Sequence, residues 1–269
     1  MAEKKQHTII SAKDGQQVTA APKAGVVSAE AKSQAGTKRI IAWVLWILAF
    51  GCEFAAFMIF AGKLHAAFVD QNPILWLIIA LALDLVLVIL GAQFWKQANH
   101  MDPISEANKA KFWLWNNMGV IVCCFAFIPF IILALTKKDA DPKMKKVAII
   151  AAIAALAIGS VSSIDYNPVS QEGLAQATQT LGDTQVYWTQ YGKKYHTHED
   201  CQHLDRSDVL TVGTIEDAVA AGRSSICKTC ANRDGLVIGD NGAVTGTIAK
   251  TEEVAEEFLT EVAEEAPAA

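Results

Sequence analysis

The sequence predicts an α-helical integral membrane protein with four transmembrane helices, followed by a small C-terminal α+β module. Two observations support this fold class. Of the 269 residues, 52% are hydrophobic although the net charge is -5, and these residues gather in four stretches that are almost free of charge. A polar segment with closely spaced histidines and cysteines follows them. We therefore expect a transmembrane domain over residues 40–164, with spans at about 40–61, 73–94, 112–135 and 147–164.

The length of each stretch fits a crossing of the bilayer. A hydrocarbon core about 30 Å thick takes roughly 20 apolar residues in a helix, with a lower limit of about 17. The first three stretches reach the former length, and the fourth is near the lower limit. Tryptophan is typical of the headgroup level, and six tryptophans lie at or near an end of the first three stretches: Trp43, Trp46, Trp76, Trp95, Trp113 and Trp115. A very apolar soluble bundle is the disfavoured alternative.

The chain begins with a polar segment, residues 1–39, that mixes Ala, Lys, Gln, Gly and Ser without helical or strand periodicity. This composition is typical of a disordered tail. No apolar run precedes Ile40, so we expect no cleavable signal peptide.

Two of the spans are expected to begin at an Asp-Pro pair. Asp can cap the free amide groups of a helix, and Pro suits the first helical position. Asp102 and Pro103 are therefore expected to start the third helix, and Asp141 and Pro142 the fourth.

The fourth span is rich in small residues: Ala148, Ala151, Ala152, Ala154, Ala155, Ala157 and Gly159. In lipid, small side chains at four-residue spacing matter because they let helix backbones approach closely. We expect this span to pack at the centre of the bundle, or against a partner protein or a second copy of the chain. The lipid bilayer is the other expected partner.

Two acidic residues lie inside the spans, Glu53 in the first and Asp84 in the second. Each is close to the middle of its span, where a carboxylate costs on the order of 3 kcal/mol. The four stretches contain no lysine or arginine that could pair with them. Two interpretations stay open: neutral acids that join helices by hydrogen bonds, and a proton or cation pathway through Glu53 and Asp84.

The distribution of Lys and Arg bears on the orientation. An even number of spans places both termini on the same side of the membrane. The positive-inside rule favours the cytoplasm for the cationic N-terminal tail, whereas the lysine-rich connection at residues 136–146 favours the opposite orientation. We expect a multi-pass protein of the cell membrane with its termini, and therefore its C-terminal module, in the cytoplasm.

After the spans, residues 165–185 are expected to form a linker with a short helix that Ser170 caps. Residues 186–233 predict a compact module: a hairpin, a loop rich in His and Cys, a short helix and a Cys-x-x-Cys pair. The short helix has capping-box spacing at Thr214 and Asp217. Residues 234–269 predict an acidic tail.

The module is too small to bury a self-sufficient core, so we expect it to need a disulfide or a metal ion. Cys227 and Cys230 have the spacing with which two thiolates bind one tetrahedral ion, and Cys201 offers a third sulfur. Three cysteines do not pair evenly into disulfides, which favours a metal. The expected fourth ligand is a nearby histidine, in this order of preference: His196, His198 and His203. Three thiolates with one imidazole are typical of structural zinc and predict a zinc-ribbon-like module.

The segments "VYWTQYGKKYHTHEDCQHL" and "GTIEDAVAAGRSSICKTCANR" resemble a small Tyr-His, Cys, Cys-x-x-Cys module found in many uncharacterised bacterial membrane and surface proteins. That module is itself similar to the zinc-binding N-terminal domain of the Ada DNA-repair protein. The membrane part, with "ANHMDPISEANKAKFW", resembles the membrane half of such proteins. The resemblance implies His196, Cys201, Cys227 and Cys230 as the zinc ligands.

Together, these features predict a non-enzymatic, membrane-anchored protein that presents a small zinc-stabilised module for binding or sensing. A thiol/disulfide redox protein using Cys227 and Cys230 is the alternative on the same residues. No arrangement of nucleophile, base and oxyanion donors, and no phosphate-binding glycine loop, can be assembled from the sequence. Acidic residues are interspersed among the basic residues of the module, so no nucleic-acid partner is expected.

Overall fold

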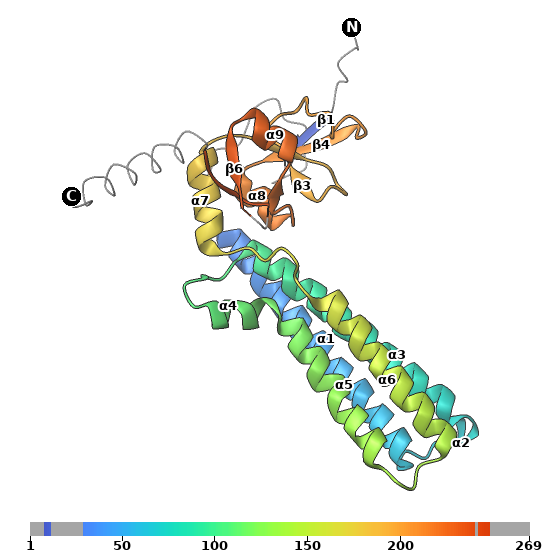
Figure 1. Ribbon diagram of the computed structural model, residues 1–269. Coiled ribbons are helices and arrows are strands. Elements are labelled where there is room, and N and C mark those ends of the chain that lie inside the picture. The colour runs from blue at the N-terminus through green and yellow to red at the C-terminus, as the bar shows by residue number, and fades with distance from the viewer. Residues whose placement is uncertain (1–7, 12–28, 240–241, 248–269) are drawn as a thin grey trace, which may run out of the picture. The chain divides into compact units, whose positions relative to one another are not determined.

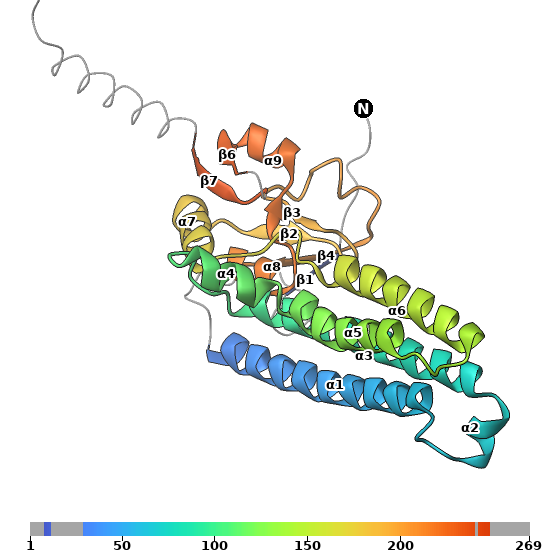
Figure 2. The same cartoon turned by 60° about the horizontal axis from the view of Figure 1, so that its bottom comes forward.

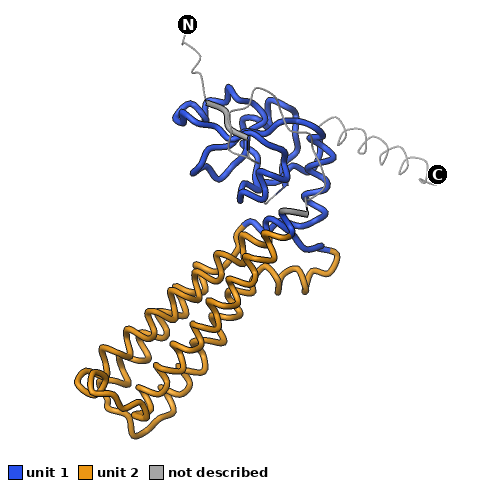
Figure 3. The backbone as a smooth tube through the Cα atoms, turned by 180° about the vertical axis from the view of Figure 1, so that it is seen from behind, with its two compact units in different colours: residues 1–32, 100–106, 167–269 blue, residues 33–99, 107–166 orange. Residues whose placement is uncertain are grey.

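The computed structural model describes residues 8–11, 29–239 and 242–247 of the chain. These residues divide into two compact units (Figure 3). One unit, the helical bundle, comprises residues 33–99 and 107–166, and the other, the C-terminal module, comprises the described residues among 1–32, 100–106 and 167–269. Each unit has a hydrophobic core of its own, as expected of parts that pack separately.

Four long helices lie side by side and antiparallel in the bundle (Figures 1 and 2): α1 (Ala29–Ala61), α3 (Pro73–Met101), α5 (Met118–Thr136) and α6 (Pro142–Ser163). Within the described part of the chain, these are the helices long and apolar enough to cross a membrane. Two short helices lie in the connections: α2 (Ala67–Gln71) and α4 (Lys109–Asn116). The structure thereby confirms the expected four apolar helices of a length that can cross a membrane.

The outer surface of the bundle is apolar. Ile47 is 66% exposed, Phe125 67% and Ile150 69%. Large apolar surfaces are rare on soluble monomers, where they mark contacts with another molecule or a membrane. Here they cover helices of membrane-spanning length, so this surface fits contact with lipid acyl chains.

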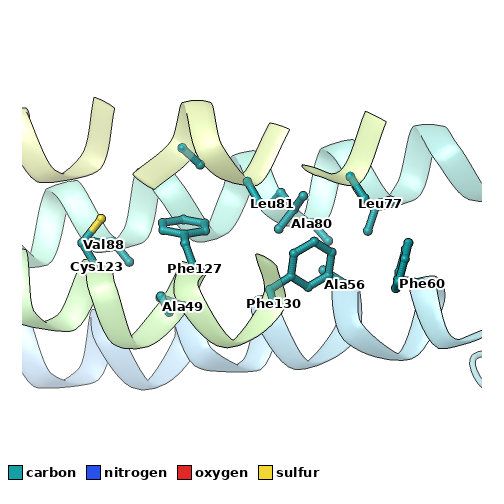
Figure 4. Close-up of a cluster of buried hydrophobic side chains, with 14 of the residues drawn as sticks. Ala49, Ala56, Phe60, Leu77, Ala80, Leu81, Val88, Cys123, Phe127 and Phe130 are labelled. Carbon is teal, nitrogen blue, oxygen red and sulfur yellow. The ribbon is translucent and has the colours of Figure 1, made fainter. Parts of the chain in front are cut away.

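Large side chains fill the centre of the bundle (Figure 4). Leu77, Leu81 and Val88 extend from α3 toward Phe127 and Phe130 of α5, and all five are less than 3% exposed. Close packing of this kind supplies much of the attraction between helices in lipid, where the hydrophobic effect does not draw them together.

The small residues of α6 allow a close approach to α5. Ala148, Ala152, Ala155 and Gly159 are buried within the bundle. A Cβ atom added at Gly159 would lie only 2.6 Å from Cys123 Sγ. The face of α6 with small residues therefore packs inside the bundle, as one of the two sequence-based alternatives expected. Contact of α6 with a partner protein or a second copy of the chain stays a prediction.

Two of the six tryptophans expected at the headgroup level are instead buried. Trp46 and Trp95 are 0% and 2% exposed, with ring centroids 5.5 Å apart. Their indole N–H groups donate to backbone carbonyls, Trp46 to Val88 O at 3.3 Å and Trp95 to Trp115 O at 2.8 Å. The interfacial interpretation was wrong for this pair, because each indole finds its hydrogen-bond acceptor inside the bundle.

The third predicted helix begins later than expected. Asp102 and Pro103 precede α4 without capping it, and the cap is Asn108, whose side chain accepts a hydrogen bond from the amide three residues on. The helix is then interrupted at Asn117, because the carbonyl of Trp115 accepts from side chains of α3, Trp95 Nε1 at 2.8 Å and Asn99 Nδ2 at 3.3 Å. Side-chain bonds of this kind compete with the backbone ladder, so the expected span 112–135 divides into α4 and α5.

Charged side chains form hydrogen bonds at the ends of the long helices, a carboxylate at an N-terminus and ammonium groups at two C-termini. The carboxylate of Asp141 accepts from the Met144 amide at 2.8 Å, which confirms the predicted start of α6. Lys96 Nζ donates to the carbonyl of Ser162 near the end of α6 at 2.9 Å. Lys137 Nζ donates in the same way to Phe60 O, at the end of α1, at 3.1 Å. An ammonium group is favourable at this end because it satisfies free carbonyls and opposes the helix dipole.

Part of the N-terminal tail that was expected to be disordered is ordered. Residues 29–39 form the beginning of α1, and Thr8–Ser11 forms strand β1, which pairs in parallel with β4 (Val209–Gly213). The β-branched run Thr-Ile-Ile has the strand propensity for this pairing. The remaining residues of the predicted tail, like residues 248–269 of the predicted acidic tail, lie outside the described part of the chain.

The C-terminal module combines three small sheets with short helices. In the first sheet the order is β1-β4-β2, and the other two are the pairs β3-β5 and β6-β7. The strands are β2 (Val186–Trp188), β3 (Lys194–Tyr195), β5 (Ser225–Ile226), β6 (Leu236–Ile238) and β7 (Val244–Thr247), and the helices are α7 (Gln171–Leu181), α8 (Ile215–Ala220) and α9 (Lys228–Arg233). Ser170 caps α7, and Thr214 with Asp217 forms the predicted capping box of α8.

The compact module is larger than residues 186–233. Leu174 and Leu181 of α7, within the expected linker, are buried in its core together with Leu236 of β6 and Val244 of β7. The apolar face of α7 needs a surface to cover it, and the core of the module supplies that surface. The elements outside the Cys-rich region thus help to hold it in place.

Candidate metal centre

Four side chains of the module come together in one buried cluster: His196, Cys201, Cys227 and Cys230. Each offers one ligand atom, and the four atoms all lie within 4.8 Å of one another. Their exposures are 6%, 4%, 4% and 1%, in that order. A buried group of nitrogen and sulfur atoms at this spacing can hold a metal ion.

The pairing of two short parallel strands places His196 beside Cys227. Tyr195 of β3 is in register with Ile226 of β5, so the next residue of each strand leaves the ladder at the same end. The Cys227 amide donates to Tyr195 O at 2.9 Å, which holds the two chain segments together. Residues that are 31 positions apart in the sequence thereby meet at the cluster.

Cys227 and Cys230 lie at the start of α9. Cys227 is the N-cap residue and Cys230 belongs to the helix. Burial opposes ionisation of Cys227, but the backbone amides of Cys230 and Thr229 point at its sulfur, and they outweigh burial, so the pKa of this thiol is below its ordinary value. Amide groups that point at a sulfur stabilise its thiolate, which is the form that binds metals.

Cys201 enters the cluster from a loop of successive turns. The Leu204 amide donates to Cys201 O at 2.8 Å. Leu204 and Leu210, at 1% and 0% exposure, pack against the three cysteines. Burial raises the pKa of the Cys201 thiol to about 12, and the neighbouring Cys230 and Cys227 sulfurs act in the same direction. A cation among these sulfurs would supply the opposite charge that a buried thiolate needs.

The two distances within the cluster fit a tetrahedral ion. Cys201 Sγ lies 3.9 Å from Cys227 Sγ, and Cys230 Sγ lies 3.7 Å from His196 Nδ1. Zn–S bonds of about 2.3 Å and Zn–N bonds of about 2.0 Å at tetrahedral angles require about 3.8 Å between two sulfurs and about 3.5 Å between sulfur and nitrogen. The two observed spacings are within about 0.2 Å of these values, so these two pairs of ligand atoms already have the separation that a tetrahedral ion requires.

His196 has the properties of a neutral ligand. Burial, aided by His203 and Lys194, lowers the pKa of its imidazole to about 4, so the ring is neutral at physiological pH and keeps a free electron pair. Its backbone exchanges two hydrogen bonds with Tyr187, at 2.8 Å and 2.7 Å, and this fixes the position of the residue.

The two substitute histidines point elsewhere. His198 Nε2 lies 2.5 Å from Asp234 Oδ1, and His203 Nε2 lies 3.1 Å from Thr229 Oγ1. Both contacts join the Cys201 loop to α9 or to the residue that follows it. The order of preference drawn from the sequence agrees with this arrangement. Asp234 was missed as a partner, because no motif links an acidic residue at that position to a histidine so far upstream.

The cysteines fall into two groups. Cys52, Cys123 and Cys124 belong to the bundle, and the other three form the cluster; all six are free thiols. The sulfurs of Cys201 and Cys227 lie 3.9 Å apart, and those of Cys227 and Cys230, the Cys-x-x-Cys pair on which the redox alternative was based, lie within 4.8 Å of each other. That alternative stays a prediction.

The chemistry of the cluster carries the functional interpretation, because no protein-family model, curated protein or solved structure matches the chain. A set of three thiols and one imidazole offers soft and borderline ligands, which suit zinc and other late transition metals and do not suit magnesium or calcium. Four protein ligands fill a tetrahedral shell. A closed shell is typical of structural sites rather than catalytic ones, which keep a position open for water.

Proposed function

We propose that this protein is a non-enzymatic, membrane-anchored zinc protein, in which four apolar helices hold a small zinc-stabilised module at the membrane surface for binding or sensing. The observation that carries the proposal is the buried cluster of four ligand atoms within 4.8 Å of one another. Two distances within it, from Cys201 Sγ to Cys227 Sγ and from Cys230 Sγ to His196 Nδ1, fit a tetrahedral site.

Zinc is the metal that this ligand set favours. Its ions accept thiolate and imidazole ligands in tetrahedral geometry and undergo no redox change. The site lies in the core of the module, where Cys230 is 1% exposed. With four protein ligands it leaves no coordination position for a substrate, so its role is to hold the module together rather than to catalyse a reaction.

The ion would join three chain segments: the end of β3, the Cys201 loop and the start of α9. β3 and β5 contain two residues each, and the contacts between the Cys201 loop and the α9 region include pairs of polar side chains that are partly exposed, such as His198 with Asp234 and Arg233 with Asp200. Structural zinc contributes about 10–16 kcal/mol of apparent binding free energy in zinc-finger peptides, and this energy appears as folding free energy. The module would then be folded with zinc and labile without it.

The resemblance to the Ada-type zinc-binding domain is part of this proposal. The present set has one histidine where the Ada-type site has a fourth cysteine, so we propose a structural zinc site without methyl transfer to a thiolate. We also propose that the module lies on the cytoplasmic side, where reducing conditions keep its thiols available for the metal. The partner or signal that the module recognises would contact its surface.

A thiol/disulfide redox function is the second candidate, and one observation favours it: the Cys201 and Cys227 sulfurs are only 3.9 Å apart. A disulfide bond of about 2.05 Å would need the two sulfurs to approach by about 1.9 Å. Such a protein would lack bound metal, and its three thiols would change oxidation state with the compartment.

Metal analysis of the full chain in detergent tests the two candidates. We expect one zinc per chain in the wild type and loss of zinc in His196→Ala and Cys227→Ser. His203→Ala and Cys124→Ser are the matched controls, because these residues lie outside the cluster, and both are expected to retain the metal. Wild-type protein that contains no metal after purification without chelator, and that carries a disulfide by mass spectrometry, would support the redox candidate instead.

A reporter fused to the C-terminus tests the orientation. A cytoplasmic reporter that is active, together with cluster cysteines that an impermeant thiol reagent does not label in intact cells, is the expected result. Labelling of Cys227 in intact cells would place the module on the extracytoplasmic side. This result would favour the redox candidate, because disulfides form in the oxidising environment there.

A further inference from the structure

Asp84 of α3 is a buried carboxyl group inside the bundle. It is 0% exposed, and neither of its side-chain oxygens has a hydrogen-bond partner among the described residues. Leu81 and Val88, one turn before and one turn after it on the same helix, point into the packed core (Figure 4). Asp84 therefore lies on the interior face of α3, surrounded by apolar side chains.

Glu53 of α1 lies at a similar depth. The connection between α1 and α3 joins the two helices at one end of the bundle (Figure 2). At a rise of about 1.5 Å per residue, Glu53 is about 12 Å from Ala61 and Asp84 is about 16 Å from Pro73, the residues that border this connection. The two carboxyl groups interact electrostatically. Unlike Asp84, Glu53 is only half-buried.

No cation balances these acids within the apolar stretches. The titratable groups of the four stretches are the two carboxyls and three thiols: Glu53, Asp84, Cys52, Cys123 and Cys124. Of the thiols, Cys123 of α5 accepts a contact from Ser160 Oγ of α6 at 3.8 Å. Thiols are neutral at physiological pH unless a cation or a strong donor stabilises the thiolate. The apolar stretches of the helices that surround Asp84 therefore present only acidic or neutral groups.

A metal ion does not suit this place. Alkali and alkaline-earth ions need six or more oxygen ligands, and the bundle offers two carboxyl groups among apolar side chains. In the described part of the chain, the group with metal-ligand spacing is the cluster in the module. The ligand that a buried, unpaired carboxylate can take without further ligands is a proton, because protonation removes the charge.

We propose that Asp84 and Glu53 form a proton-binding site inside the four-helix bundle. Asp84 holds a proton in the apolar interior, and Glu53, which is half-buried, is the group through which this proton exchanges with water. The transfer requires the two side chains to approach each other, because neither Asp84 oxygen has a hydrogen-bond partner among the described residues: the Asp84 O–H bond breaks as a Glu53 O–H bond forms, and Glu53 then releases a proton to water. A bundle that only anchors a module has no need for such a pair.

Infrared spectroscopy of the full chain in lipid vesicles tests the proposal. A protonated carboxyl group gives a carbonyl band distinct from those of carboxylates and amides, and this band shifts when deuterium replaces the proton. We expect a band in the wild type that Asp84→Asn removes, and that shifts after transfer to heavy water. Glu53→Gln is expected to slow this shift by at least about tenfold, a modest value beside the 10²–10⁴-fold typical of a positioned acid or base.

Asp70→Asn is the matched control, because this acid is in the connecting segment α2 and its side chain is 54% exposed. It is expected to leave both the band and its exchange unchanged. If Asp84→Asn does not fold, Asp84→Glu keeps a protonatable group and is expected to move the band.

Three results would overturn the proposal. A wild-type spectrum without a band that depends on Asp84 would show an ionised or otherwise paired side chain. A band that never shifts in heavy water would show a sealed, permanently neutral acid that serves packing alone. An exchange rate that is the same in Glu53→Gln would remove Glu53 from the pathway.

Discussion

Replacement of Cys230 by Ser tests the metal centre most directly. The side chain is 1% exposed and its sulfur lies 3.7 Å from His196 Nδ1, so the substitution removes one ligand and leaves the local shape nearly unchanged. Removal of a group that only hydrogen-bonds to a metal ligand already weakens metal binding by about 10–100-fold. Loss of a ligand should weaken metal binding by at least about 100-fold, which is about 2.8 kcal/mol at about 1.4 kcal/mol per factor of ten.

This loss should appear as lost folding stability, because binding of structural zinc and folding are coupled. The free energy of unfolding of a small domain is about 5–15 kcal/mol in total, so a decrease of about 2.8 kcal/mol or more is a large fraction of it. Amide hydrogen exchange followed by mass spectrometry can measure it on peptides from β3 to α9, separately from the bundle. We expect faster exchange there in Cys230→Ser and in chelator-treated wild type, with bundle peptides unchanged.

Cys124→Ser serves as the control for the loss of a thiol, since Cys124 belongs to the bundle. It should leave zinc content and exchange of the module as in the wild type. A Cys230→Ser protein that keeps one zinc per chain and the wild-type exchange rates would refute the reasoning, because the cluster would then not depend on this ligand.

Two further predictions concern packing and pH. Gly91→Ala places a Cβ atom 2.4 Å from Trp46 Nε1 and should destabilise the bundle by about 1–3 kcal/mol, which thermal unfolding in detergent can measure. The control is Gly51→Ala, where an added Cβ has nothing within 4 Å and should be neutral or slightly stabilising. Equal effects of the two substitutions would contradict the packing argument. The hydroxyl of Ser105 and the amide that follows it hold the pKa of the Glu172 carboxyl below its ordinary value. The stabilisation by this carboxylate should therefore be present above the ordinary pKa and should be lost as the pH falls through the lower folded value. Amide exchange in residues 100–106 should rise over that acidic range in the wild type, and an equal rise in Glu172→Gln would contradict the prediction.

The helices of the bundle could be predicted well because lipid imposes a simple length requirement. A run of about 20 apolar residues is enough to identify a span, and the Asp141 cap could be identified from its position before Pro142. The break at Asn117 could not, because it depends on the Trp115 carbonyl, which accepts from side chains of another helix. Trp46 and Trp95 were misplaced for a similar reason: their acceptors are carbonyls of other helices, Val88 O of α3 and Trp115 O of α4.

The composition of the cluster could be predicted from residue types, because thiols and imidazoles are scarce and their chemistry is specific. Cys227 and Cys230 are close in sequence, so their spacing alone indicates a shared ligand role. The choice of histidine depends on the register of β3 against β5, which brings His196 beside Cys227. His198 and His203 are equally near in sequence, and only their contacts with Asp234 and Thr229 distinguish them.

The sequence by itself determined that this protein has four apolar spans and a Cys- and His-bearing module, because these features depend on local composition and on the length of a bilayer crossing. The tertiary structure decided which side chains meet. Two features depend on how distant segments pack: the meeting of His196 with Cys201, Cys227 and Cys230, and the position of Asp84 without a hydrogen-bond partner among the described residues. Local patterns specify the elements, whereas the ligand set of a site depends on contacts between elements.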